Sequence, residues 1–174
     1  MELYAERGFE QTTVAEIAER AGLTARTFFR HFADKREVLF AGSEFLEQHL
    51  VDALSAAPQA AAPMEAVAAA LDAAAEVLPD RAWAAHRQSV IAAHADLRER
   101  ELIKMASFSA ALADALRRRG AGEPEASLAA ETGVAVFRVA FERWVGEPED
   151  RGLATVIHES FDRWRALAAP TPTA

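Results

Sequence analysis

The sequence predicts an all-α protein with an N-terminal helix-turn-helix domain and a C-terminal helical domain. The chain is half hydrophobic and rich in alanine, and its apolar residues recur at the three- to four-residue spacing of helices. No stretch alternates β-branched and polar residues as a half-buried strand would. The 8 Gly and 7 Pro fall mostly between the helical stretches. A chain of 174 residues is also long enough to bury a substantial core.

The composition excludes several kinds of site and of cellular location. The chain has no cysteine, which excludes disulfides and thiolate metal sites, and it shows no signal sequence and no long uncharged apolar stretch. We therefore expect a cytoplasmic protein without a membrane partner. The net charge of -8 would repel nucleic acid on average, so any DNA binding depends on a local basic surface.

Two short helices are expected before residue 22. Residues 2–7 read as the last turns of a first helix, which Gly8 terminates. Thr13 and Glu16 have the spacing of a capping box, in which each side chain satisfies a free backbone N–H of the opening turn, so a second helix begins there. One apolar stripe at helical spacing follows this cap: Val14, Ile17, Ala18 and Ala21.

A tight turn leads into a third short helix. Gly22 supplies the permissive backbone of a C-cap and Thr24 is a good N-cap, so the two helices meet at a steep angle, as in a helix-turn-helix. The free face of the third helix offers groups that suit a major groove, namely Ala25, Arg26, Thr27, Phe29 and Arg30. Four cations and a single carboxylate, Asp34, fall between residues 24 and 36, which concentrates basic charge here.

One segment closely resembles the DNA-binding domain of TetR-type bacterial transcriptional regulators: GFEQTTVAEIAERAGLTARTFFRHFADKREVL. The resemblance implies that Arg26, Thr27 and Arg30 face bases or phosphates. It also implies that His31 and Lys35 hold the DNA backbone. The full set of residues expected at the DNA is Thr13, Thr24, Ala25, Arg26, Thr27, Phe29, Arg30, His31 and Lys35.

Two departures from the family pattern leave a second interpretation open. Phe29 stands where the family usually has tyrosine, and a phenylalanine ring cannot donate a hydrogen bond to a phosphate. Met1 stands only seven residues before Gly8, whereas family members begin with a full first helix, so whether Met1 is the true start stays open. The alternative function is a helical ligand-binding or protein-interaction module with a vestigial helix-turn-helix.

A long helix is expected after the helix-turn-helix. Asp34 can cap it, and it would run to about Leu54 and connect the two halves of the chain as a lever. A low-complexity break, SAAPQAAAP, follows at residues 55–63. These features predict a DNA-binding domain at residues 1–40, a ligand-binding and dimerisation domain at 41–168, and a disordered tail at 169–174.

Five helices are expected in the second domain. Pro79 ends the first of them, at residues 64–78, and two more follow up to a run of arginines before Gly120, which is a strong stop signal. The tetrapeptide GEPE occurs at residues 122–125 and 146–149 and brackets the fourth helix. The fifth helix follows the second GEPE.

The last two helices are more apolar than a small domain needs for its own core. We infer that they pair across a twofold axis in a homodimer. Gly133 costs about 1 kcal/mol inside a helix relative to alanine, which is more tolerable if a neighbouring backbone of the partner approaches it closely. The alternative is a packing gap within one subunit. The residues predicted at the dimer interface are Gly133, Val136, Ala140, Trp144, Val156, Ile157, Phe161 and Trp164.

A second resemblance concerns the region from residue 87 to residue 144, with the stretches SVIAAHADLRERELIK and ALRRRGAGEPEASLAAETGVAVFRVAFERWV. It resembles the C-terminal domain of actinobacterial regulators of the mycofactocin-associated type, which implies a long-chain acyl-CoA or similar acyl ligand. An anionic head group could meet Arg81, Arg87 or Arg98, which could equally be solvated. Aromatic residues that could line an apolar tunnel, or equally serve the core, are Phe45, Trp83, Phe108, Phe137 and Phe141.

Catalysis, a cofactor and a metal site are not expected. His86 and His94 lie eight residues apart on a helix, too far to chelate one ion without further ligands. The chain has no Glu-x-x-His pair, no nucleophile motif and no phosphate loop. The sequence therefore predicts a homodimeric repressor that binds a near-palindromic double-stranded DNA operator and is released by a small apolar or acyl effector.

Overall fold

The computed structural model describes residues 2–78, 80–147 and 151–169. Within these ranges the chain forms nine α-helices, one 3-10 helix and no β-strand, so the predicted all-α class is confirmed. The elements are α1 (Glu2–Arg7), α2 (Val14–Arg20), α3 (Ala25–His31), the 3-10 helix η1 (Glu37–Phe40), α4 (Ser43–Ala56), α5 (Pro63–Val77), α6 (Arg81–Ala93), α7 (Ala95–Arg118), α8 (Glu125–Gly146) and α9 (Leu153–Ala168).

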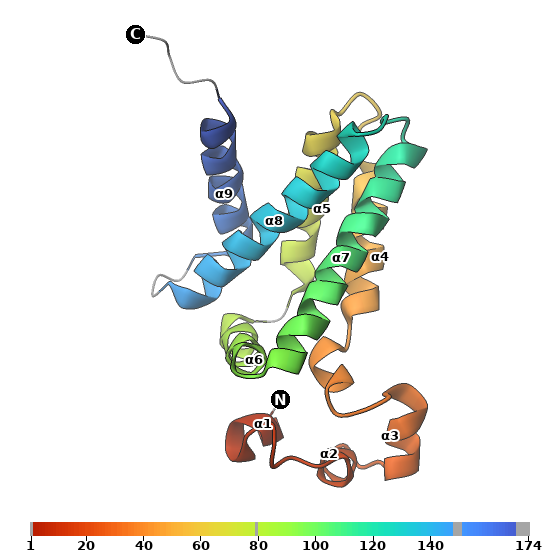
Figure 1. The fold of residues 1–174 in the computed structure, drawn as a ribbon, viewed down its shortest axis with the longest axis vertical. Coiled ribbons are helices and arrows are strands. Elements are labelled where there is room, and N and C mark those ends of the chain that lie inside the picture. Colours follow the sequence, from red (N-terminus) through yellow and green to blue (C-terminus); the bar gives the residue numbers. More distant parts are fainter. Residues whose placement is uncertain (1, 79, 148–150, 170–174) are drawn as a thin grey trace.

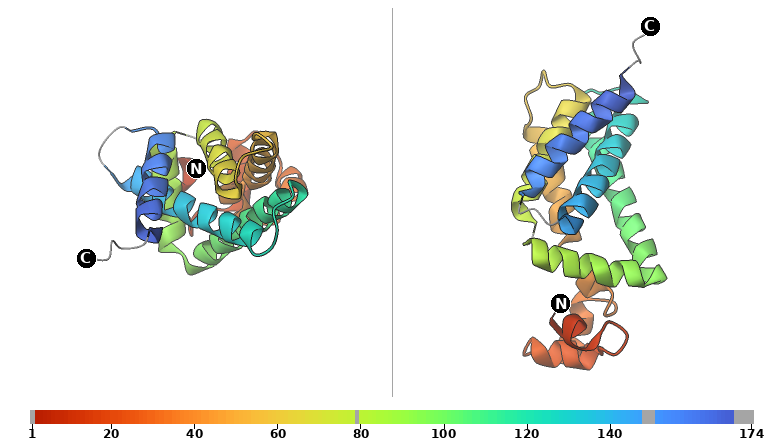
Figure 2. Two further views of the ribbon diagram at one scale, coloured as in Figure 1. Left: turned by 90° about the horizontal axis from the view of Figure 1, so that it is seen from above. Right: turned by 90° about the vertical axis from the view of Figure 1, so that its left-hand side faces the viewer.

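The helices form two units of unequal size. Helices α4, α5, α7 and α8 lie side by side, and α9 packs against α8 and α5 (Figure 1). Helix α6 lies across one end of this assembly, and the short helices α1–α3 lie beyond α6 at the same end (Figure 2). We call residues 2–40 the head and helices α4–α9 the bundle.

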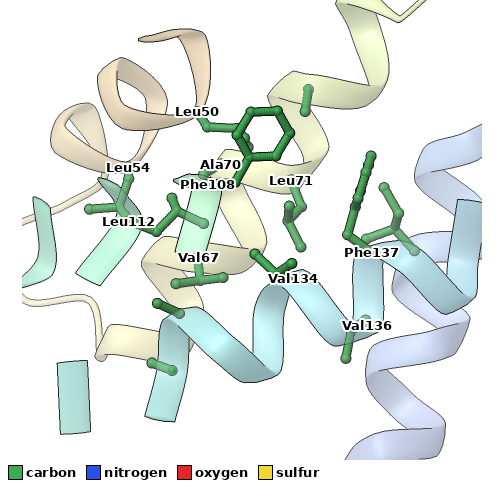
Figure 3. Packing of buried hydrophobic residues seen from close by; sticks show 14 of the residues in the cluster. Leu50, Leu54, Val67, Ala70, Leu71, Phe108, Leu112, Val134, Val136 and Phe137 are labelled. Carbon is green, nitrogen blue, oxygen red and sulfur yellow. The ribbon is translucent and has the colours of Figure 1, made fainter. Parts of the chain in front are cut away.

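The core of the bundle is built around the small side chains of α5. Ala66, Val67 and Ala70 are completely buried, and this lets α4 and α8 approach α5 from either side. Figure 3 shows the result, with Val67, Ala70 and Leu71 of α5 surrounded by Leu50, Leu54, Phe108, Leu112, Val134 and Phe137.

Gly133 of α8 marks the closest approach to α5. A Cβ atom at this position would overlap Cγ1 of Val67. The glycine is thus explained by a close contact with α5 inside one subunit, and not by the packing gap that was the alternative to a partner.

Replacing Gly133 by alanine is expected to lower the free energy of unfolding by about 1–2 kcal/mol. Because the added methyl group would overlap Cγ1 of Val67, the cost of overpacking lies in the upper part of the usual range of about 1–3 kcal/mol, and the better helix propensity of alanine returns about 1 kcal/mol. Urea unfolding measures the difference. The matched control is Gly146→Ala, where a Cβ meets no atom within 4 Å. A Gly133→Ala protein at least as stable as wild type would contradict the close approach.

The predicted continuous helix from Asp34 to about Leu54 was wrong. Gly42 has φ +88°, a left-handed conformation that separates η1 from α4, so the chain bends between the head and the bundle. Asp34 accepts the backbone N–H of Arg36 (2.8 Å) and holds a local turn instead of capping a long helix. A single rigid lever therefore does not join the two units.

The remaining expectations concern the ends of the bundle. Helices α5 to α9 follow the predicted order, and Gly120, with φ +96°, ends α7 as expected. Residues 170–174 of the predicted tail lie outside the described residues. Among the helices that are described, none combines the length and the apolar character needed to span a lipid bilayer.

Candidate functional site

Hydrogen bonds within the head fix the turn between α2 and α3. The side chain of Thr13 accepts the N–H of Glu16 (3.3 Å), and the Glu16 carboxylate accepts the N–H of Thr13 (2.8 Å), so the predicted capping box is confirmed. Gly22 has φ +68°, as the turn requires. Thr24 then caps α3 by accepting the N–H of Thr27 (3.1 Å).

With these caps, one side of α3 packs against the rest of the head, and the other side is exposed to solvent. Phe28 is only 4% exposed, and its ring lies 5.2 Å from that of Phe32. The neighbouring Phe29 is 57% exposed. The exposed residues of α3, which we call the α3 face, are Ala25, Arg26, Phe29, Arg30 and His31.

Two arginines one helical turn apart give the α3 face its positive charge. Among the described residues, the Arg26 side chain has no ion-pair or hydrogen-bond partner. The Arg30 guanidinium contacts only the ring of His31, with its Nε 3.4 Å from Nε2. Guanidinium groups on an exposed helix can form paired hydrogen bonds to guanine edges or phosphates.

Lys35 has a different environment from the other predicted DNA-binding residues. Its ammonium group donates to the carbonyl oxygens of Phe9 (2.8 Å), Glu10 (3.1 Å) and Thr12 (3.1 Å), and it lies 4.6 Å from the centre of the Phe9 ring. These contacts use the three donors of the ammonium group inside the head. The structure thus gives Lys35 the task of holding the segment between α1 and α2.

A cavity of about 490 Å³ lies where the head meets the bundle. This volume is within the range of small-molecule sites, and most of the lining is apolar. Trp83 and Ile91 of α6 contribute to one wall, and Leu46 of α4 and Met105 of α7 to others. The structure brings all the residues predicted at the ligand into this lining: Phe45, Trp83, Arg87, Phe108, Phe137 and Phe141.

Arg87 is the most constrained polar group of the cavity. Its Nε donates to the Leu39 carbonyl (2.7 Å), and its Nη1 donates to the Glu101 carboxylate (3.1 Å). The guanidinium also lies over the Phe40 ring. Burial lowers the pKa of Arg87 below its usual range, and the charge of Glu101 opposes this shift. Arg87 is therefore committed to contacts within the chain.

The cavity and the head share residues. Leu39 and Phe40 line the cavity and also pack with Tyr4 and Phe9 in a buried cluster that includes Ile91 of α6. Further contacts join the head to the α6–α7 corner: ion pairs link Arg36 to Asp96 and Arg100 to Glu37, and Nδ1 of His94 lies 3.3 Å from the Glu10 carboxylate. An occupant of the cavity would therefore lie against residues of the head core.

Two cations of the cavity were not predicted from the sequence, and one of the three arginines offered there as alternatives lies outside the lining. Lys104 of α7 and Arg138 of α8 line the cavity, whereas Arg81 is absent from the lining. Arg98 lines it, and its guanidinium donates to the Ala92 carbonyl (2.7 Å). No local sequence pattern marks Lys104 and Arg138 as cavity residues, because only the packing of α7 on α8 places both of them in the lining.

Most of the residues predicted at the dimer interface lie inside the subunit. Their burial within one chain explains their apolar character without a partner. Only Trp164 of this set is partly exposed; the buried members are Gly133, Val136, Ala140, Trp144, Val156, Ile157 and Phe161. The exposed large apolar residues of these two helices are Leu128 and Val139 on α8 and Leu167 on α9.

Comparisons with known sequences agree on a family for both units. Residues 1–41 match the family described as bacterial regulatory proteins, tetR family, and residues 61–169 match the MftR C-terminal domain. The HTH-type transcriptional regulator TcmR of Streptomyces glaucescens is 39% identical over 70 residues, which are 40% of this chain and 31% of TcmR. The match thus spans about a third of the length of that relative.

Solved structures share the fold over most of the chain. The TetR family regulator PfmR of Thermus thermophilus has a TM-score of 0.52 at 22% identity, covering 94% of this chain and 93% of its own. A transcriptional regulator of Rhodococcus sp. Rha1 has a TM-score of 0.50 at 26% identity, with 93% and 89% covered. The repressor FadR of Thermus thermophilus, in complex with lauroyl-CoA, has a TM-score of 0.52 at 23% identity, with 100% and 95% covered.

Proposed function

Because the chain belongs to the TetR family of bacterial regulatory proteins, we propose that it is a homodimeric transcriptional repressor that a small apolar or acyl ligand releases from a near-palindromic DNA operator. Residues 2–40 bind the operator through the α3 face, and the bundle binds the effector and the second subunit. The two arginines of this face supply the positive charge that a chain of net charge -8 otherwise lacks.

One observation carries the proposal. The apolar cavity is lined by Leu39 and Phe40, which are also core residues of the head, so the occupant of the cavity contacts the unit that carries the α3 face. A ligand that prefers one position of the head shifts the population toward it. FadR, which has the same fold, was solved with lauroyl-CoA, and this favours an acyl chain as the occupant here.

The dimer follows from the geometry of operator recognition. A single α3 helix reads only a few base pairs, so a specific site needs two heads related by a twofold axis and spaced about one helical turn of DNA apart. We assign the contact between subunits to the outer faces of α8 and α9. Exposed Leu128, Val139 and Leu167 are the apolar residues available there.

The proposal predicts that the purified protein selects one or a few near-palindromic sites from fragmented genomic DNA of the organism that encodes it. Specific sites should stay enriched as salt approaches physiological strength, because non-specific phosphate contacts weaken steeply with salt. Light scattering should give the mass of a dimer, and lauroyl-CoA or a related acyl thioester should release the selected DNA. Binding that is only non-specific would favour the alternative, a ligand-binding module with a vestigial helix-turn-helix.

A further inference from the structure

Two cations of the cavity have no partner in the described part of the chain. Lys104 and Arg138 line the cavity, and neither side chain forms an ion pair or a hydrogen bond with a described residue. The other two cations of the lining are committed, since Arg87 pairs with Glu101 and Arg98 donates to a backbone carbonyl. The uncompensated positive charge of the cavity is therefore concentrated on α7 and α8.

The two unpaired cations stand at the same level of the bundle. Lys104 lies 14 residues before Arg118, the last residue of α7, and Arg138 lies 13 residues after Glu125, the first residue of α8. At about 1.5 Å per residue, each is about 20 Å from the turn that joins these antiparallel helices. The two helices diverge from that turn toward α6 (Figures 1 and 2). The cations therefore flank the cavity from neighbouring helices, and we call this pair the cationic rim.

The positive charge of the cationic rim lies apart from the apolar interior of the cavity. Arg138 is exposed and Lys104 is partly buried, whereas Phe108 and Phe137, on the same two helices, are buried core residues that also line the cavity. A multiply charged group loses too much hydration to enter the apolar interior, but it can remain in water beside the rim. An acyl chain has the opposite preference and suits the interior.

We propose that Lys104 and Arg138 bind the phosphate-bearing head group of an acyl-CoA-type ligand, whose acyl chain occupies the apolar cavity. This inference rests on the proposed function and adds the direction in which the ligand binds. The head group lies between α7 and α8, and the chain points toward Phe108 and Phe137. Arg87 is less available to the head group, because its Nε and Nη1 already donate to Leu39 and Glu101 and its charge is paired with Glu101.

Glu142 allows a second prediction, in which a substitution changes ligand affinity in the opposite direction. It lies one helical turn after Arg138, it also lines the cavity, and it forms no ion pair or hydrogen bond with a described residue. A carboxylate here repels an anionic head group. Removing its charge should therefore strengthen binding of the same ligand that loss of Lys104 and Arg138 weakens.

The test compares two thioesters that share an acyl chain and differ in charge. Lauroyl-CoA carries phosphates, and lauroyl-pantetheine carries none. By calorimetry, the Lys104→Gln/Arg138→Gln variant should lose about tenfold in affinity for lauroyl-CoA and should keep its affinity for lauroyl-pantetheine. Glu142→Gln should bind lauroyl-CoA a few-fold more tightly. The matched control is Arg118→Gln, an exposed arginine at the far end of α7.

The results distinguish failure of the rim from failure of the acyl ligand. Suppose that wild type binds both thioesters and that the double variant binds lauroyl-CoA as tightly as wild type does. This result would overturn the role of the cationic rim and leave the proposed function intact. If wild type binds neither thioester, the acyl ligand is wrong, and the rim is tested with the anionic dye anilinonaphthalene sulfonate and the neutral dye N-phenylnaphthylamine. Selective loss of the anionic dye in the double variant supports an anion site, and equal binding of both dyes overturns it.

Discussion

Replacing both Arg26 and Arg30 by alanine is expected to weaken operator binding by roughly a thousandfold or more. An arginine that forms paired hydrogen bonds to a base contributes about 1–3 kcal/mol, and a dimer loses each contact twice. Both side chains project from the exposed α3 face, away from the core, so the stability of the protein and its affinity for the ligand should be unchanged. Fluorescence anisotropy on the selected operator measures the loss, and unfolding in urea checks the fold.

The salt dependence shows what each arginine contacts. An arginine that neutralises a phosphate should reduce the slope of log affinity against log salt by about 1 per subunit, or about 2 for the dimer, when it is removed. An arginine that reads a base should relax specificity at one position of each half-site. Arg118→Ala provides the matched control, because it removes an exposed arginine at the opposite end of the molecule. Equal losses for Arg26→Ala and Arg118→Ala would mean that net charge, and not the α3 face, governs binding.

The parts of the fold that could be predicted from the sequence are those that depend on neighbours along the chain. The capping box of Thr13 and Glu16, the left-handed Gly22 and the Thr24 cap each involve residues three or fewer positions apart. Their geometry follows from side-chain chemistry and a short spacing. The bend at Gly42 was missed although its signal was local, because the apolar positions on either side of it continue the helical spacing.

Lys35 shows why charge in sequence does not give the direction of a side chain. The density of cations between residues 24 and 36 suggested a single basic surface. The Lys35 ammonium, however, meets carbonyl oxygens of residues 23 to 26 positions earlier in the chain. Such contacts depend on how the head closes on itself, and no spacing rule contains them.

Gly133 and the cationic rim show the same limit in the bundle. The sequence suggested a partner's backbone or a packing gap at Gly133, and the close contact with α5 was missed, because helical periodicity gives the apolar face and not its neighbour. Lys104 and Arg138 are separated by a complete helical hairpin, and their common level depends on where that hairpin turns. The aromatic lining was easier to predict, since large apolar side chains lie in the interior whichever helices meet.

Replacing Arg87 by methionine is expected to lower the free energy of unfolding by about 2–4 kcal/mol. Arg87 and Glu101 are 16% and 22% exposed, so the substitution leaves a largely buried carboxylate without its partner and the Leu39 carbonyl without its donor. Arg165→Met, which removes an ion pair between exposed side chains of α9, should stay within about 0.5 kcal/mol of wild type. Urea unfolding of both variants gives the comparison.

The same residue should be needed to transmit ligand binding to the head. Arg87 joins α6 and α7 of the bundle to Leu39, a residue of the head that also lines the cavity. Coupling between two sites is a free energy, measured as the ratio of ligand affinities with and without operator. In Arg87→Met/Glu101→Leu, which restores an uncharged pair, the ligand should still bind but that ratio should fall toward one. A stable double variant that still releases the operator as wild type does would show that the head is moved through its other contacts with the bundle, such as the apolar cluster of Tyr4, Phe9 and Phe40, and not through Arg87.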